Sequence, residues 1–182
     1  MKNALKLGGI YGIISTIIGL GYPMIMGLES MFNWKIMLGS MVVGLIIFIV
    51  LGRKMIRPSE GDNTLYYGEA LKYLFVAAIV GNTISSVSSV AMYNGNEKIE
   101  EAFEKYTLET QEATLKMAMN LAGASEEEMA VEMEELHERI ESGEVPLATF
   151  PFSWAALPMT ILSSIFAALI LALISAIFVK KT

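Results

Sequence analysis

The chain has few side chains of the kinds that enzymes use, and they are scattered. Its one histidine, His137, follows Glu134 at a Glu-x-x-His spacing. Two such motifs, with further glutamates, build di-iron centres in helix bundles, but this sequence has only one. Cysteine is absent, which excludes disulfides, thiolate nucleophiles and cysteine-ligated metals. We therefore expect no catalytic residue, no metal site, no bound cofactor and no enzymatic activity.

Longer sequence motifs of known catalytic and ligand-binding sites are absent as well. The sequence has no HExxH, P-loop, GxSxG or dinucleotide-binding pattern, and its glutamates do not follow the spacing of an EF-hand. The 13 methionines are expected to be core filler, because the thioether side chain fits irregular gaps. No nucleic-acid partner is expected.

Two opposite charges stand at the threshold of an apolar run, in the stretch LYYGEALKYLF. Glu69 lies where a helix N-terminus favours a carboxylate, and Lys72 can reach back to lipid phosphates or pair with Glu69. The pair is then an interfacial start signal for a helix. In the alternative, Glu69 faces the bundle interior and pairs with Lys6, Arg53 or Lys72 to bind an ion or hold a gate.

The stretch GNTISSVSSV, inside the same apolar run, is rich in hydroxyl side chains. Asn82, Ser86 and Ser89 recur on one helical face. Polar groups in lipid need partners and often mark pathways, so this face could line a hydrated path or bind a small ligand. The structural alternative is that the hydroxyls bond back to their own helix while Asn82 joins a neighbouring helix.

The elements that must position these residues are four apolar segments. A bilayer-spanning helix needs about 20 predominantly apolar residues. Residues 5–26, 34–51, 71–92 and 158–179 meet this requirement, and charges occur only near their edges. The chain is 54% hydrophobic and 18% charged, so it lacks the polar surface to cover these segments in water. The lipid bilayer is therefore the first expected partner, and the first segment is predicted to be a retained span rather than a cleaved leader.

The basic residues that flank the segments indicate an orientation, because Lys and Arg in short loops favour the cytoplasm. Eight of them fall on one side of a four-span arrangement: Lys2, Lys6, Arg53, Lys54, Arg57, Lys72, Lys180 and Lys181. We expect both termini to be cytoplasmic. The long connection over residues 93–153 is then extracytoplasmic.

That connection is acidic and patterned. Residues 92–153 hold 15 Glu against 4 Lys and Arg. Apolar residues at helical spacing predict two amphipathic helices, over about 96–121 and 126–141, with a capping box at Ser125 and Glu128 between them. The apolar positions are Ile99, Phe103, Tyr106, Ala113 and Met117, then Met129, Met133, Leu136 and Ile140. The two helices are expected to fold against each other or against the ends of the spans. An acidic face disfavours anionic lipid, so packing of residues 96–141 on a protein partner or on themselves is favoured.

Small residues recur at four-residue steps in the spans, which allows helices in lipid to approach closely. In the last span these are Ser164, Ala168, Ala172 and Ala176; in the first they include Gly8 and Gly12. We expect packing within one bundle. Self-association through the same faces is the alternative.

The order of these features resembles a known family. ALKLGGIYGIIS opens the first span, GRKMIR ends the second, and LYYGEALKYLF precedes the third; ASEEEMAVEMEEL lies in the acidic connection and VKK ends the last span. The whole chain resembles domain of unknown function 4199, small four-span bacterial membrane proteins. The most specific likeness is the Gly-Glu-Ala-Leu-Lys step of residues 68–72. The resemblance implies a bacterial inner-membrane setting and no particular chemistry.

We therefore predict an all-α fold, a four-span transmembrane helix bundle with an extracytoplasmic amphipathic helical hairpin between spans 3 and 4. The expected function is structural or protein-interacting, through the acidic connection. The alternative is a small transporter or channel that uses the polar face of span 3. The candidate functional side chains are Glu69, Lys72, Asn82, Ser86 and Ser89.

Overall fold

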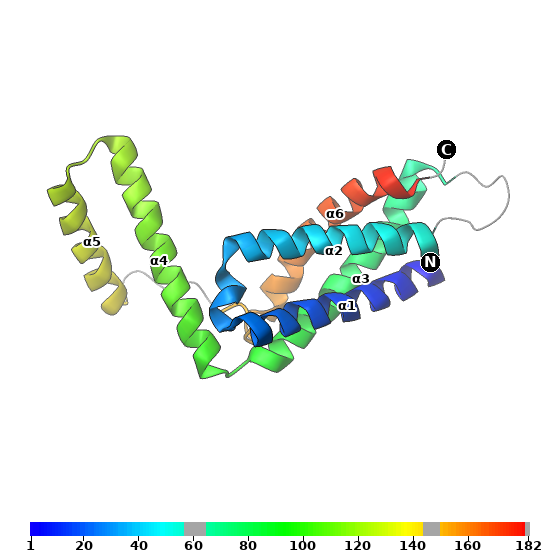
Figure 1. Cartoon of the computed structure of the whole chain (residues 1–182), viewed down its shortest axis with the longest axis horizontal. Helices are drawn as coiled ribbons and strands as arrows, with labels where there is room; N and C mark the ends of the chain where they lie inside the picture. Colours follow the sequence, from blue (N-terminus) through cyan, green and yellow to red (C-terminus); the bar gives the residue numbers. More distant parts are fainter. Residues whose placement is uncertain (57–64, 144–149, 181–182) are drawn as a thin grey trace. The chain divides into compact units, whose positions relative to one another are not determined.

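A computed structural model describes residues 1–56, 65–143 and 150–180 and confirms the all-α prediction. Four long apolar helices correspond to the predicted spans: α1 (Lys2–Met26), α2 (Trp34–Met55), α3 (Tyr67–Tyr93) and α6 (Leu157–Val179). A short 3₁₀ helix, η1 (Leu28–Phe32), joins α1 to α2. The chain divides into two compact units, a bundle (Met1–Gly95 with Pro151–Thr182) and an inserted hairpin (Asn96–Phe150), each described here by itself (Figure 1).

Three of the four spans extend three or four residues beyond the ends that hydropathy predicts. The first helix begins at Lys2 rather than residue 5, the second ends at Met55 rather than residue 51, and the third begins at Tyr67 rather than residue 71. Charged and aromatic residues occupy these additional turns. A hydropathy window stops at such residues, but a helical backbone continues through them, because long side chains reach from the helix end to the headgroups.

In the bundle, α3 packs mainly against α1 and α6, while α2 makes lighter contacts with α1 and α6. The ends of the bundle differ in chemistry. At one end, called the basic end here, lie Lys2, Lys6, Arg53, Lys54, Lys72 and Lys180, and both chain termini are found there (Figure 1). The other is called the insertion end, because α3 stops and α6 starts there, on either side of the inserted hairpin.

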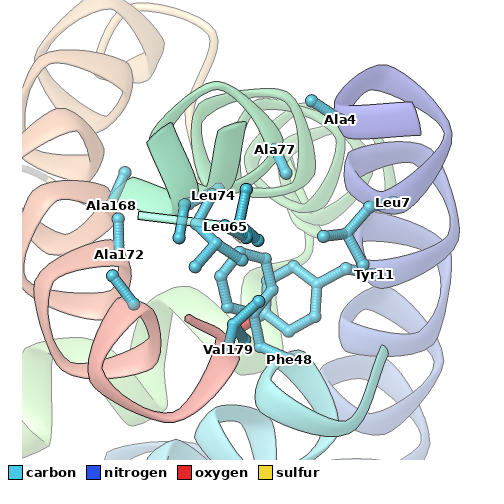
Figure 2. Packing of buried hydrophobic residues seen from close by; sticks show 13 residues of the cluster. Ala4, Leu7, Tyr11, Phe48, Leu65, Leu74, Ala77, Ala168, Ala172 and Val179 are labelled. Carbon is cyan, nitrogen blue, oxygen red and sulfur yellow. The ribbon is translucent and has the colours of Figure 1, made fainter. Parts of the chain in front are cut away.

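The buried core of the bundle lies in the half nearer the basic end. The rings of Tyr11 and Phe48 meet edge to face with centroids 4.7 Å apart, next to each other in the centre of the cluster (Figure 2). Ala168, Ala172 and Ala176 of α6 are fully buried in this cluster. These alanines therefore pack within the bundle, as expected.

The closest helix crossing joins α1 to α3 through glycine. A Cβ atom added to Gly8 would lie 2.6 Å from the Ala77 carbonyl oxygen, and one added to Gly12 would lie 2.9 Å from the Gly81 carbonyl oxygen. The two backbones thus touch without intervening side chains. Without a hydrophobic force between helices in lipid, such close contact supplies much of the association through dispersion.

The hairpin consists of α4 (Glu97–Ala122) and α5 (Glu126–Glu141), within one residue of the predicted bounds. Gly123 ends α4 in the left-handed conformation, with φ 77°, which glycine adopts without strain. Ser125 then caps α5. The Glu128 amide donates to the Ser125 hydroxyl at 3.3 Å, and the Glu128 carboxylate accepts from the Ser125 amide at 2.8 Å. The predicted capping box is confirmed.

Candidate functional sites

The charged pair at the start of α3 lies on the surface. Glu69 and Lys72 are both exposed, and neither makes an ion pair within the described part of the chain. Glu69 occupies the first turn of α3, where the helix dipole favours its charge. Glu69 therefore lies on the surface of the bundle, and the structure does not bring it into the bundle interior.

Arg53, which the sequence offered as a partner for Glu69, binds elsewhere. Its Nε donates to the carbonyl oxygen of Phe178 at 2.9 Å. That carbonyl belongs to the last turn of α6, where backbone acceptors have no partner within the helix. The cation and the negative end of the α6 dipole also attract each other. Arg53 therefore links α2 to the end of α6, a role that sequence spacing alone could not reveal.

Aromatic side chains mark both ends of the bundle. Tyr66 and Tyr67 lie at the basic end, and the Tyr67 hydroxyl donates to the Leu173 carbonyl oxygen at 3.3 Å. Trp34 and Trp154 are exposed at the insertion end. Amphipathic rings of this kind favour the headgroup level of a bilayer, so their two positions fit a bundle that spans it.

The polar face of α3 makes one hydrogen bond to another helix among the described residues. Asn82 Nδ2 donates to the Ser164 carbonyl oxygen at 3.2 Å, which joins α3 to α6. This agrees with the structural role considered for Asn82. Ser86 and Ser89 are partly exposed on the same side of α3.

The expected back-bonds of the α3 hydroxyls are not found. Thr16 of α1 donates to the carbonyl four residues earlier, at 2.8 Å, and Ser164 of α6 to the one three residues earlier, at 2.7 Å. Within the described chain, the hydroxyls of Thr83, Ser85, Ser86, Ser88 and Ser89 make no such bond. The structural interpretation is therefore wrong for these five side chains, whose hydrogen-bonding capacity is left open.

The base of the hairpin insertion is closed by contacts within the bundle. The Trp154 amide donates to Asn94 Oδ1 at 3.2 Å, and the rings of Tyr93 and Phe152 meet edge to face with centroids 5.3 Å apart. The chain therefore leaves the bundle and returns to it at almost the same point. An insertion with such ends places little strain on the surrounding fold.

Within the hairpin, the predicted apolar stripe of α4 divides. Ile99 is buried, but Ala113 and Met117 are exposed, as is Leu121 one turn later. In the second half of α4 the half-buried positions lie on another face: Leu108, Gln111, Glu112, Leu115 and Met119. Because this face contains the polar residues Gln111 and Glu112, a hydropathy pattern does not detect it. The predicted apolar positions of α4 are therefore not all covered within the described part of the chain.

The single histidine joins the two hairpin helices. His137 Nε2 lies 2.9 Å from Glu112 Oε1, whereas its sequence neighbour Glu134 is exposed. No group of three or more metal-ligating side chains exists among the described residues. The His137–Glu112 contact thus holds α4 to α5.

Comparison with known proteins identifies a family. Residues 6–181 match the family described as protein of unknown function (DUF4199), nearly the full chain, and the chain belongs to that family. No curated protein and no solved structure matches it. The family description assigns no activity, so any activity has to be argued from the residues.

Proposed function

We propose that this member of the family is a multi-pass protein of the bacterial inner membrane whose extracytoplasmic hairpin binds another protein chain. The four apolar helices support the membrane setting, and the charge of the basic end supports cytoplasmic termini. The hairpin would then stand outside the cytoplasm. Its role is structural or regulatory rather than enzymatic.

The main support for an interaction role is the uncovered apolar stripe on α4. Met117 is 65% exposed and Leu121 is 85% exposed, and they are one turn apart on the same face. The stripe lies away from the face that packs with α5. Adjacent apolar side chains left uncovered on a folded unit are typical of surfaces that bind a partner.

The charge of the hairpin favours a protein over lipid as the partner. Helix α5 alone carries eight Glu and one Arg, so an anionic membrane surface would repel it. Two hairpins would repel each other for the same reason, which favours a different chain over a second copy. A separate open hollow of about 620 Å³ at the hairpin turn, on the side of α4 that faces α5, is lined by Met119 and Val131 beside Glu127 and Glu132.

Site-specific photo-crosslinking in cells tests this proposal. A benzophenone amino acid at position 117 or 121 should give a discrete protein adduct. The same group at the exposed Glu104, elsewhere around α4, should give none. An adduct of twice the chain mass would identify a second copy instead. Equal labelling at all three positions, or none, would count against the interaction role.

A matched deletion separates the hairpin from the bundle. Because Asn94 and Trp154 lie in hydrogen-bond contact, residues 96–150 can be replaced by a short Gly-Ser linker. The bundle should still insert and fold. Any cellular phenotype that depends on the crosslinked partner should disappear. A deletion that leaves every phenotype of the wild type intact contradicts the proposal.

The orientation is tested separately, and the absence of cysteine makes labelling simple. A Ser125→Cys variant should react with a membrane-impermeant thiol reagent added to intact cells whose outer membrane is permeabilised. A Lys54→Cys variant should react only after the inner membrane is opened. The reverse pattern would place the hairpin in the cytoplasm.

A further inference from the structure

The bundle is packed unevenly along its length. No residue is fully buried within 13–22 of α1, 34–47 of α2, 82–89 of α3 or 157–167 of α6, all of which the structure describes. Buried residues resume at the insertion end with Pro23, Val90 and Tyr93. A layer of looser packing thus lies between the packed core and the insertion end.

This layer contains the polar face of α3. Gly81 contacts α1, and Asn82 binds α6. Ser85 follows Gly81 by four residues and Asn82 by three, so helical geometry points it between α1 and α6, into the bundle. Ser89 lies one turn further on the same side, and both serines are partly exposed.

The α3 hydroxyls of the layer need a partner that the described chain does not supply. Ser85 and Ser89 make no hydrogen bond there, as noted above. A polar group without a hydrogen bond in an apolar medium is strongly destabilising, and lipid has nothing to offer it. Water satisfies such groups wherever they line a polar space large enough to hold it.

Tyr93 gives a second, independent indication. Its side chain is 5% exposed, and its hydroxyl is buried without a hydrogen-bond partner among the described residues. Tyr93 follows Ser89 by four residues, and long side chains in a helix lean toward its N-terminus. The phenol is therefore directed back along the face that carries Ser89 and Asn82. A buried phenol and neighbouring serines that all lack a hydrogen-bond partner in the described chain indicate bound water.

We infer that water occupies this layer, bonded to Tyr93, Ser85 and Ser89, and that it enters from the insertion end. The packed core of Tyr11, Phe48 and Gly81 closes the layer toward the basic end. Apart from tyrosine, the segments of the layer carry one ionisable side chain, Lys35, which is exposed at the start of α2. The site therefore takes water and small uncharged hydrogen-bonding molecules rather than ions. This inference does not depend on the role of the hairpin.

Cysteine accessibility in proteoliposomes tests the inference. Thiols react as thiolates, which form in water and not in lipid. Ser85→Cys and Ser89→Cys should react with a small impermeant methanethiosulfonate roughly a hundredfold faster than Val87→Cys, which is exposed on the opposite side of the same turns. Leu74→Cys in the packed core should be as slow as Val87→Cys. Full labelling of each variant after denaturation in SDS controls for the thiol content.

The same samples show from which side of the membrane water and reagent enter the layer. Ser125→Cys marks the hairpin side of each vesicle preparation and Lys54→Cys the basic side. Reaction of Ser89→Cys with reagent on the hairpin side supports the inference. Reaction only from the basic side, or rates at Ser85→Cys and Ser89→Cys no faster than at Leu74→Cys, would overturn it. A rate at Val87→Cys equal to that at Ser89→Cys would also overturn it, because water would then surround the whole helix.

Tyr93→Phe supplies a readout that needs no cysteine. If water bonds the phenol, removing the hydroxyl leaves the unfolding midpoint unchanged or lowers it, because one favourable hydrogen bond is lost. If the phenol is dry and unpaired, the same change removes a buried unsatisfied group and raises the midpoint. A raised midpoint would therefore contradict a hydrated layer.

Discussion

The crossing of α1 and α3 gives the sharpest stability prediction, because the chain supplies its own control. Gly8 and Gly9 are adjacent in α1, and replacing either with alanine improves helix propensity by about 1 kcal/mol. A Cβ at Gly9 would meet nothing within 4 Å. A Cβ at Gly8 would lie 2.6 Å from the Ala77 carbonyl oxygen and 2.8 Å from the Val80 Cβ.

The size of the effect follows from these distances. Ordinary contact begins at 3.4 Å, so the Gly8→Ala methyl group overlaps the Ala77 oxygen by 0.8 Å. That oxygen belongs to a helix backbone and cannot rotate away, so the helices must separate. A gap of about 0.5–1 Å forfeits a quarter to a half of the dispersion attraction at each contact. Overpacking of this kind destabilises by about 1–3 kcal/mol.

The propensity gain is common to both variants, so the difference between them isolates packing. We expect Gly8→Ala to be less stable than Gly9→Ala by about 1–3 kcal/mol. The measurement is an SDS titration of the protein in mild micelles, with the folded fraction read by pulse proteolysis. Equal midpoints for the two variants, or a more stable Gly8→Ala protein, would refute close backbone packing at this crossing.

Three further predictions use the same unfolding assay or its spectroscopic equivalent. Asn82→Ala should destabilise the bundle by about 0.6–1.7 kcal/mol, the range for interhelical hydrogen bonds in membranes, and an unchanged midpoint would show that its bond to α6 is not formed. Arg53→Ala should lower stability by about 1 kcal/mol through loss of the α6 cap, while the neighbouring Lys54→Ala should not; equal effects would contradict the cap. Hydrogen bonds from the Ser125 amide and then its hydroxyl hold the pKa of Glu128 below its usual range. The contribution of the capping box to the stability of α5 should therefore be complete at pH values above the ordinary glutamate pKa. It should decline as the pH falls through the lowered pKa, which circular dichroism of α5 would detect. A Ser125→Ala protein with the same acid response would contradict this.

The sequence predicts the elements of this protein well because their signals are local. A run of apolar residues, a capping box and a left-handed glycine each depend on a few neighbouring positions. The bounds of α5 and the cap at Ser125 follow directly from such signals. The predicted lengths of three spans are too short for a related reason. Hydropathy reports the apolar interior of a helix and not its interfacial turns.

What the sequence could not predict depends on contacts between elements. The four-residue spacing of Gly8 and Gly12 predicts a packing face, but it does not show that this face meets α3 rather than another helix. Arg53 is one of several basic residues near the membrane edge, and its bond to α6 depends on where α2 ends relative to Phe178. The face of α4 that packs with α5 contains Gln111 and Glu112, so an apolar pattern points to the other face.

Helix α3 changes character between two consecutive residues. Up to Gly81 it is built from small and apolar residues that contact α1 and α6 directly, and dispersion holds the three helices together. From Asn82 onward hydroxyl side chains become frequent. Ile84 still packs closely against Gly12 of α1, but no residue of 82–89 is fully buried. Because lipid cannot hydrogen-bond to a serine, such a change within one span is stable only if something polar fills the second half. The Asn82–Ser164 bond holds α3 to α6 at this boundary, so that α3 stays joined to the bundle while the hydroxyls beyond remain available to water.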